Sequence, residues 1–214
     1  MKCLLIHNYY QNSGGEDGVF QAEAEMLRSN GHEVLEYVCC NDEIRGYGIW
    51  RRLTLGIRTA WARDSLGDLR RILADEKPDA VHMHNTFPLI SPAAYYACSE
   101  VSVPVVQSLH NYCILCAAAT LYRDGHVCEE CLTKGALHGI RHGCYRKSRV
   151  ATAASGGMVW FHPLRRTWND RVDRFIRLTS RPKFSVYAGK AILSRHPIEA
   201  FRLIRTHCCL SINF

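Results

Sequence analysis

The stretch "KCLLIHNYYQNSGGEDGVFQAEAEMLRSNGHEVLEYV", residues 2–38, holds two apolar runs separated by a glycine-containing loop and an amphipathic segment. The amphipathic segment, residues 18–30, repeats apolar side chains at helical spacing and stops before Gly31, a residue suited to the left-handed backbone at helix ends. The flanking runs, residues 2–7 and 33–38, are short and apolar, as buried strands are. The stretch therefore predicts a strand–helix–strand unit with parallel strands.

The same alternation continues along the chain. We predict further strands at residues 80–84, 105–110 and 174–179, and helices at residues 65–76, from Ser91-Pro92 onward and at residues 150–161. Ser91 offers an N-cap oxygen, and Pro92 suits the first helical position. The pattern favours an α/β fold: a Rossmann-like parallel sheet with helices on both faces. We predict one domain over residues 1–190, interrupted by a Cys-rich insert at 111–147 and followed by an atypical tail at 191–214.

Length and composition predict a globular, cytoplasmic protein. The chain has 214 residues, of which 47% are hydrophobic, enough to bury a core. No apolar run reaches the roughly 20 residues of a membrane-spanning helix, and the first one is too short for a secretory signal. Residues 1–44 hold two Lys/Arg against eight Asp/Glu, whereas the rest hold 25 against 12. The basic part suits phosphates or an anionic membrane surface.

A His-Asn pair follows the apolar run of three predicted strands: His7-Asn8, His84-Asn85 and His110-Asn111. In open α/β sheets, ligands bind beyond the carboxyl ends of the strands. Each pair alone is better explained by hydrogen bonds to nearby backbone. Three pairs on three strands favour a shared site.

The loop after the first predicted strand places Gly14 and Gly15 directly before a helix. Glycines let a diphosphate approach backbone amides at the positive end of the helix dipole. The loop matches neither the dinucleotide fingerprint nor the P-loop, so an ordinary turn is the alternative. Glu16 and Asp17 disfavour a phosphate and suit sugar hydroxyls or, for Asp17, helix capping.

Three stretches, "LLIHNYYQNSGGED", "KPDAVHMHNTFPLISPAA" and "PVVQSLHNYCILC", resemble the N-terminal, acceptor-side domain of family 4 glycosyltransferases, enzymes with the two-Rossmann-domain GT-B fold. The resemblance covers roughly residues 1–190. It implies transfer of a sugar from a nucleotide-sugar donor to a saccharide or lipid-linked acceptor, with retention of configuration and without a catalytic metal. Such a reaction belongs to glycan or lipid-linked saccharide synthesis.

The resemblance also implies roles for individual residues. His110 orients the donor sugar and stabilises charge during transfer, to which a neutral imidazole contributes one hydrogen-bond donor. The predicted substrate-binding residues are Asn8, Tyr9, Gly14, Gly15, Glu16, His84, Asn85 and Asn111.

Members of this family carry a second Rossmann domain that grips the nucleotide, and the sequence departs from their pattern at about Ala188. We therefore expect a truncated chain, or one that needs a separate donor-binding domain as its partner. The activity of this chain by itself is then in question.

Five of the 11 cysteines lie between residues 113 and 144, as two Cys-x2-Cys pairs and a single cysteine. This spacing presents thiolates to tetrahedral zinc and predicts a structural zinc site. The spacing alone equally supports Cys113 with Cys116, Cys128 and Cys131. Relatives in the family tend to have another residue at position 113, so the resemblance favours Cys116, Cys128, Cys131 and Cys144. Free thiols and reversible disulfides are the alternatives.

Basic residues flank the predicted helix at residues 150–161, among them Arg146, Arg149, Arg165 and Arg166. They suit a peripheral contact with the inner face of the membrane, at about 1 kcal/mol per cation, and equally suit a solvated surface. A different hypothesis is a non-catalytic, zinc-stabilised basic module that binds nucleic acid or protein. Nucleic acid is the less favoured partner, because the specific matches lie at strand ends rather than in the basic stretch.

Overall fold

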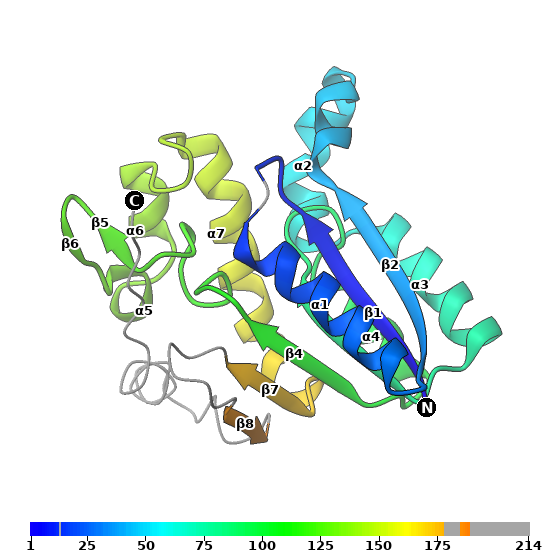
Figure 1. Cartoon of the computed structure of the whole chain (residues 1–214). Coiled ribbons are helices and arrows are strands. Elements are labelled where there is room, and N and C mark those ends of the chain that lie inside the picture. Colours follow the sequence, from blue (N-terminus) through cyan, green and yellow to red (C-terminus); the bar gives the residue numbers. More distant parts are fainter. Residues whose placement is uncertain (13, 178–184, 189–214) are drawn as a thin grey trace.

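The computed structural model describes residues 1–12, 14–177 and 185–188, which form a six-stranded sheet with helices on both faces (Figure 1). The strand order is β2-β1-β3-β4-β7-β8. The first five strands are parallel, and β8 pairs with β7 in the antiparallel direction. The strands are β1 (Lys2–Tyr9), β2 (Glu33–Cys40), β3 (Ala80–Asn85), β4 (Val105–Leu109), β7 (Arg174–Arg177) and β8 (Ser185–Ala188). The predicted Rossmann-like α/β class is confirmed.

The helices of the described chain fall into two groups. Those between or after the sheet strands are α1 (Gly15–Ser29), the 3-10 helix η1 (Asn41–Gly46), α2 (Ile49–Ala60), α3 (Arg63–Glu76), α4 (Ala94–Glu100), α7 (Arg149–Leu164) and α8 (Thr167–Asp170). The segment between β4 and α7 holds a small hairpin, β5 (Tyr122–Arg123) and β6 (His126–Val127), and two short helices, α5 (Glu130–Thr133) and α6 (Leu137–His142). We call residues 111–147 the cysteine insert.

Strand alternation decides which helix covers which face of the sheet. Leu4 and Ile6 of β1 are fully buried in the cluster formed with α3 and α4. Leu5, between them, is fully buried against Phe20 and Ala24 of α1. Successive side chains of a strand point to opposite faces, so α1 covers one face, while α3 and α4 cover the other. Each such buried side chain contributes roughly 1.5–3 kcal/mol.

The predicted strands agree with the structure to within about two residues wherever the chain is described. Residues 178–179 of the last predicted strand and the predicted tail at 191–214 lie outside the described residues. The start of α4 was predicted wrongly: Ser91 has a left-handed backbone with φ 61°, and the helix begins at Ala94. The Ser91 hydroxyl oxygen instead accepts the backbone amides of Ala93 and Ala62. Helix α2 was not predicted.

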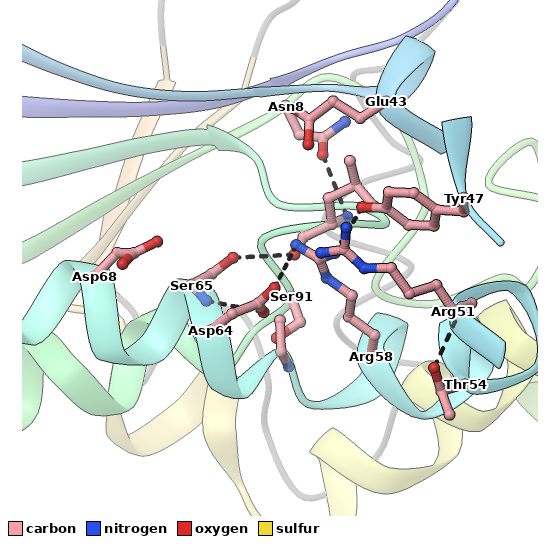
Figure 2. Close-up of polar contacts among 12 residues, drawn as sticks. Asn8, Glu43, Tyr47, Arg51, Thr54, Arg58, Asp64, Ser65, Asp68 and Ser91 are labelled. Atoms are coloured by element: carbon pink, nitrogen blue, oxygen red, sulfur yellow. Dashed lines mark hydrogen bonds and ion pairs between the residues drawn. The ribbon is translucent and has the colours of Figure 1, made fainter. Parts of the chain in front are cut away.

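A polar network fixes the loop that follows β3 (Figure 2). The Asn8 side-chain oxygen accepts the Leu89 amide at 3.2 Å, and the Ser65 hydroxyl donates to the Leu89 carbonyl at 3.1 Å. Nearby, Arg58 of α2 donates to the Tyr47 hydroxyl at 2.6 Å and pairs with Asp64 at 2.8 Å. The network therefore joins β1, α2 and α3 to the loop and holds the end of β3 in place.

Candidate functional site

Four histidines and a serine line the α1-facing side of the sheet: His7 on β1, His82 and His84 on β3, Ser108 on β4, and His110 just after β4. We call these five residues the histidine seam. Residues two apart on a strand share a face, and Leu5 pairs with His82 in the sheet. The alternation therefore brings all five under α1. The ring centroids of His82 and His84 are 4.5 Å apart, and those of His84 and His110 are 5.3 Å apart.

Helix α1 places two carboxylates, those of Asp17 and Glu23, against the seam. His7 Nε2 lies 2.8 Å from Asp17 Oδ1, and both side chains are buried. Glu23 hydrogen-bonds His82 Nδ1, and its second oxygen lies 3.3 Å from His84 Nε2. Phe20, from the same helix face, stacks on His7 with a centroid distance of 4.8 Å. The inward stripe of α1 thus supplies one aromatic ring and two acids.

Hydrogen bonding fixes the protonation pattern of the seam. Since an ionised carboxylate only accepts hydrogen bonds, His82 donates from Nδ1 to Glu23 and accepts the Ser108 hydroxyl at Nε2, at 2.9 Å. A proton on His84 Nε2 likewise faces Glu23, which leaves His84 Nδ1 as an acceptor. His110 Nε2, 3.2 Å from that atom, then donates to it. The remaining ring nitrogen of His110, Nδ1, is an acceptor in this arrangement.

The electrostatics of the seam agree with this pattern. Burial, and then repulsion from His84, His7 and His82, lowers the pKa of His110 to about 3. Burial also lowers the pKa values of His7 and His84, in spite of the neighbouring acids. For Glu23, burial acts to raise the pKa, but the hydrogen bonds with His82 and His84 outweigh it and bring the pKa to about 2. At neutral pH the imidazoles of His7, His84 and His110 are thus neutral, and the Glu23 carboxylate is ionised.

The predicted glycine loop lies at the amino end of α1. Gly14 is the N-cap residue, and its amide donates to Asp17 Oδ2 at 3.1 Å, so the predicted capping role of Asp17 is present. Gly14 and Gly15 are exposed, and a side chain at either position would meet no atom within 4 Å. Burial, and then the Asp17 charge, raises the pKa of Glu16 to about 7. Glu16 is therefore protonated in part near neutral pH.

The asparagines of the three His-Asn pairs lie apart from the histidine rings. Asn85 donates to the Asn8 carbonyl at 2.7 Å and accepts the Phe87 amide at 3.0 Å, and Asn8 donates to Asn41 at 3.0 Å. Asn111 accepts the Cys113 amide at 2.9 Å. Both Asn8 and Asn85 are buried. These three side chains hold the loops around the seam through hydrogen bonds of their own.

Several buried polar atoms at this edge lack a hydrogen-bond partner within the described structure. They are His7 Nδ1, His84 Nε2, which meets Glu23 off the ideal direction, and Glu16 Oε2. Buried polar atoms are almost always satisfied in folded proteins. Two of these atoms lie at the carboxyl ends of β1 and β3, where the strand order reverses, and the third lies at the amino end of α1; this is the position at which α/β sheets bind ligands. Tyr9 lies beside them, its ring edge-on to His7 at 4.6 Å.

The five cysteines of the insert divide between two environments. Burial raises the pKa of Cys113, whose thiol faces Glu16 and packs at the edge of the main core. Cys116 and Cys131 hydrogen-bond to each other, which lowers the pKa of Cys116 to about 6 and raises that of Cys131. Cys144 lies within electrostatic range of Cys116 and Cys128. The described cysteines are free thiols.

A compact group of potential metal ligands also occurs in the seam. One ligand atom each from Glu23, His82 and His84 lies within 4.8 Å of the other two, in the described part of the chain. These groups already hydrogen-bond to one another, or lie in ion-pair contact, without a metal. Glu23 thus lies between two imidazoles, hydrogen-bonded to His82 and in ion-pair contact with His84, whose Nε2 has no hydrogen-bond partner in the described structure.

Sequence reasoning found His7, His84 and His110 but missed Asp17 as a partner of His7, and also Glu23, His82 and Ser108. The missing signal was alternation: His82 shares a strand face with His84, and Ser108 shares one with His110. Glu23 follows Phe20 by three residues and so belongs to the inward stripe of α1. A carboxylate in an inward stripe is a signal that can be read from sequence.

No protein-family model and no curated protein matches the chain. Among solved structures, it is similar to a S. aureus MnaA-UDP co-structure, with a TM-score of 0.36 and 14% sequence identity. The match covers 69% of this chain and 42% of that one, so the chain spans less than half of that protein's length. Within the described residues, no helix is long and apolar enough to cross a membrane.

Proposed function

We propose that this chain is the acceptor-side half of a retaining, nucleotide-sugar-dependent glycosyltransferase. The observation that carries the proposal is the partly buried chain of contacts Glu23–His84–His110 at the carboxyl end of the sheet, beside the glycine-capped start of α1. A sugar ring needs polar groups of fixed orientation, and the diphosphate attached to it needs amide donors and the end of a helix dipole. Both features lie at one edge of this fold.

His110 is assigned to holding the donor sugar. Its neutral ring donates from Nε2 to His84 and keeps Nδ1 as an acceptor, so it receives a sugar hydroxyl rather than donating to a departing oxygen. This changes the role expected from the sequence, in which His110 also stabilised developing charge. Glu23 and His84 are positioning residues, because they fix the tautomer through which His110 acts.

The diphosphate is assigned to the exposed turn at Gly14 and Gly15. The partial neutrality of Glu16 near pH 7 reduces its repulsion of a phosphate and leaves a carboxyl group that can bond to a sugar hydroxyl. Asp17 stays engaged with the Gly14 amide and with His7. The acceptor is assigned to the side lined by Tyr9 and His84, with Asn8, Asn85 and Asn111 holding the surrounding loops.

The test is a transfer assay with a panel of nucleotide sugars and with saccharide and lipid-linked acceptors. It is read by mass spectrometry of the acceptor and by nucleotide release. We expect sugar transfer from at least one donor, in the presence of a separate donor-binding domain where the chain needs one. We expect this transfer to be lost in His110→Ala. His32→Ala is the control, since His32 lies at the opposite edge of the sheet, directly before β2. Equal rates in both variants would refute the role of His110, and failure to bind any nucleotide sugar would refute the proposal.

A further inference from the structure

The cysteine insert lacks a hydrophobic core large enough to account for its order. Its hairpin strands have two residues each, and its helices have four and six. A cluster formed mainly within the insert has two buried members, Cys116 and Leu121, with Cys131 and Leu132 packed beside them. Small units of this kind are usually held by disulfides or by a metal. The described cysteines are free thiols, and two Cys-x2-Cys pairs followed by a single cysteine have the spacing of a thiolate metal site.

Cys113 lies outside the cluster that forms around the hairpin. Its thiol belongs to the edge of the main core and faces Glu16 of the histidine-seam side. Cys116 and Cys131 contact each other, and Cys144 lies in range of both Cys116 and Cys128. Cys113 is also within electrostatic range of Cys116, but its side chain packs against the main core rather than with Cys116 and Leu121, which favours the set that contains Cys144.

Backbone amides point at the sulfur atoms of the cluster. Those of Ala118, Thr120 and Leu121 lie in hydrogen-bonding positions toward Cys116, and those of Ala117 and Gly139 do so toward Cys131. Amide donors around a sulfur favour its thiolate form and are the usual outer shell of a thiolate metal centre. Burial raises the pKa of the Cys144 thiol, and the positive charge of Arg123, on the hairpin, acts against this rise.

We infer that Cys116, Cys128, Cys131 and Cys144 form a closed structural site for a thiophilic divalent metal, with zinc as the expected ion. Four thiolates satisfy tetrahedral zinc without an open position, so the site binds no substrate. The sulfurs are spread more widely than the roughly 3.8 Å between thiolates that zinc–sulfur bonds of about 2.3 Å imply. Metal binding would therefore draw the four sulfurs closer together.

The site joins the histidine seam to α7. A side chain at position 139 would meet Cys131 Sγ at 3.2 Å and Ala117 at 3.3 Å, so α6 packs tightly on the Cys116 turn. That turn begins within three residues of His110, through the bond from the Tyr112 amide to the Ala119 carbonyl. The proposed metal thus links the segment that follows His110 to helix α6 and stabilises its position.

The test is the zinc content of the reduced, purified chain, measured by elemental mass spectrometry. We expect one zinc per chain, retained in Cys113→Ser and lost in Cys131→Ser and Cys144→Ser. A wild-type chain without metal, or a mass deficit showing a disulfide under non-reducing conditions, would overturn the inference. Loss in Cys113→Ser with retention in Cys144→Ser would overturn the ligand set. Loss of zinc in Glu23→Gln would contradict the cysteine site and indicate that the metal binds at the histidine seam instead.

Cysteine variants can misfold, so the wild-type chain is also titrated with Co²⁺. We expect the intense sulfur-to-cobalt charge-transfer absorption of a tetrahedral thiolate site, displaced by one equivalent of zinc. A spectrum without that absorption contradicts the inference irrespective of how the variants fold. Neither measurement depends on sugar transfer, so a failed transfer assay leaves the metal inference intact.

Discussion

The histidine seam and the cysteine insert are adjacent in sequence but are stabilised in different ways. The seam consists of polar side chains placed by strand alternation under α1, inside a fold with a large apolar core. The insert has short elements and a small apolar cluster. The apolar core of the sheet therefore supports the seam whether or not a ligand is present, whereas the insert lacks such a core and, under the proposal, is held together by its metal.

The largest expected effect is therefore metal removal. A chelator, or Cys131→Ser, should accelerate amide hydrogen exchange across residues 113–144 by about 1,000-fold or more, because the binding energy of a structural zinc is folding energy for the unit that holds it. Exchange in β1, β3 and α1 should change little. Equal acceleration in both regions would show that the insert and the sheet unfold as one unit, and Cys113→Ser serves as the control.

Next in size is the loss of transfer in His110→Ala. We expect a fall in kcat/KM of about 100-fold or more, as for removal of a group that holds the reacting part of a substrate. Thermal stability should be nearly unchanged, since His110 is only partly buried. Calorimetry alongside the transfer assay checks both points. A large loss of stability with unchanged transfer would assign His110 to folding.

A smaller effect is expected for Glu23→Gln, because Glu23 acts through His84. Transfer should fall by about 10-fold, the lower end for a group that orients a functional residue. NMR of ¹⁵N-labelled histidine should show a changed tautomer at His84 or His110, which a purely structural role would not produce. Glu25→Gln is the matched control, since Glu25 is exposed on the same helix. Unchanged imidazole signals in Glu23→Gln would contradict a role of Glu23 in fixing the tautomers of His84 and His110.

The smallest effect is the pH dependence of the fold. The pKa of His110 is lowered to about 3 and that of His162 to about 4, both mainly by burial, so the unfolded chain binds protons near pH 6.5 that the folded chain does not. Stability therefore falls as the pH falls below about 6.5, by on the order of 1 kcal/mol for each such histidine before pH 5.

Glu16 acts in the opposite direction. Its pKa is raised to about 7, so its contribution is lost as the pH rises from about 4.5 to 7. Since several buried histidines oppose one glutamate, we expect a net loss of stability on acidification, measured as a lower urea midpoint. Glu16→Gln should steepen that loss. A midpoint that stays constant between about pH 7 and pH 5 argues against neutral buried imidazoles.

Much of the fold could be predicted from the sequence, because the strands are short apolar runs between helical periods. The main miss among the helices is α2. Its Ile49, Leu53 and Ile57 recur at helical spacing, so the signal was present in the sequence, although Ile49, Trp50 and Ile57 are exposed in the structure. The start of α4 was misplaced because Ser91 has a left-handed backbone, and its hydroxyl oxygen accepts the distant Ala62 amide as well as that of Ala93.

The sequence by itself determined the order of elements along the chain: an apolar run, a glycine turn, a helix, and a histidine at each of three strand ends. It could also give the number and spacing of the insert cysteines. Tertiary structure decided which groups meet. Glu23 reaches His82 and His84, 59 and 61 positions further along, because α1 crosses the sheet at that point. Cys113 is separated from Cys116 and Cys131 because its side chain packs against the main core. Such partners are set by packing between distant elements, which local spacing does not encode.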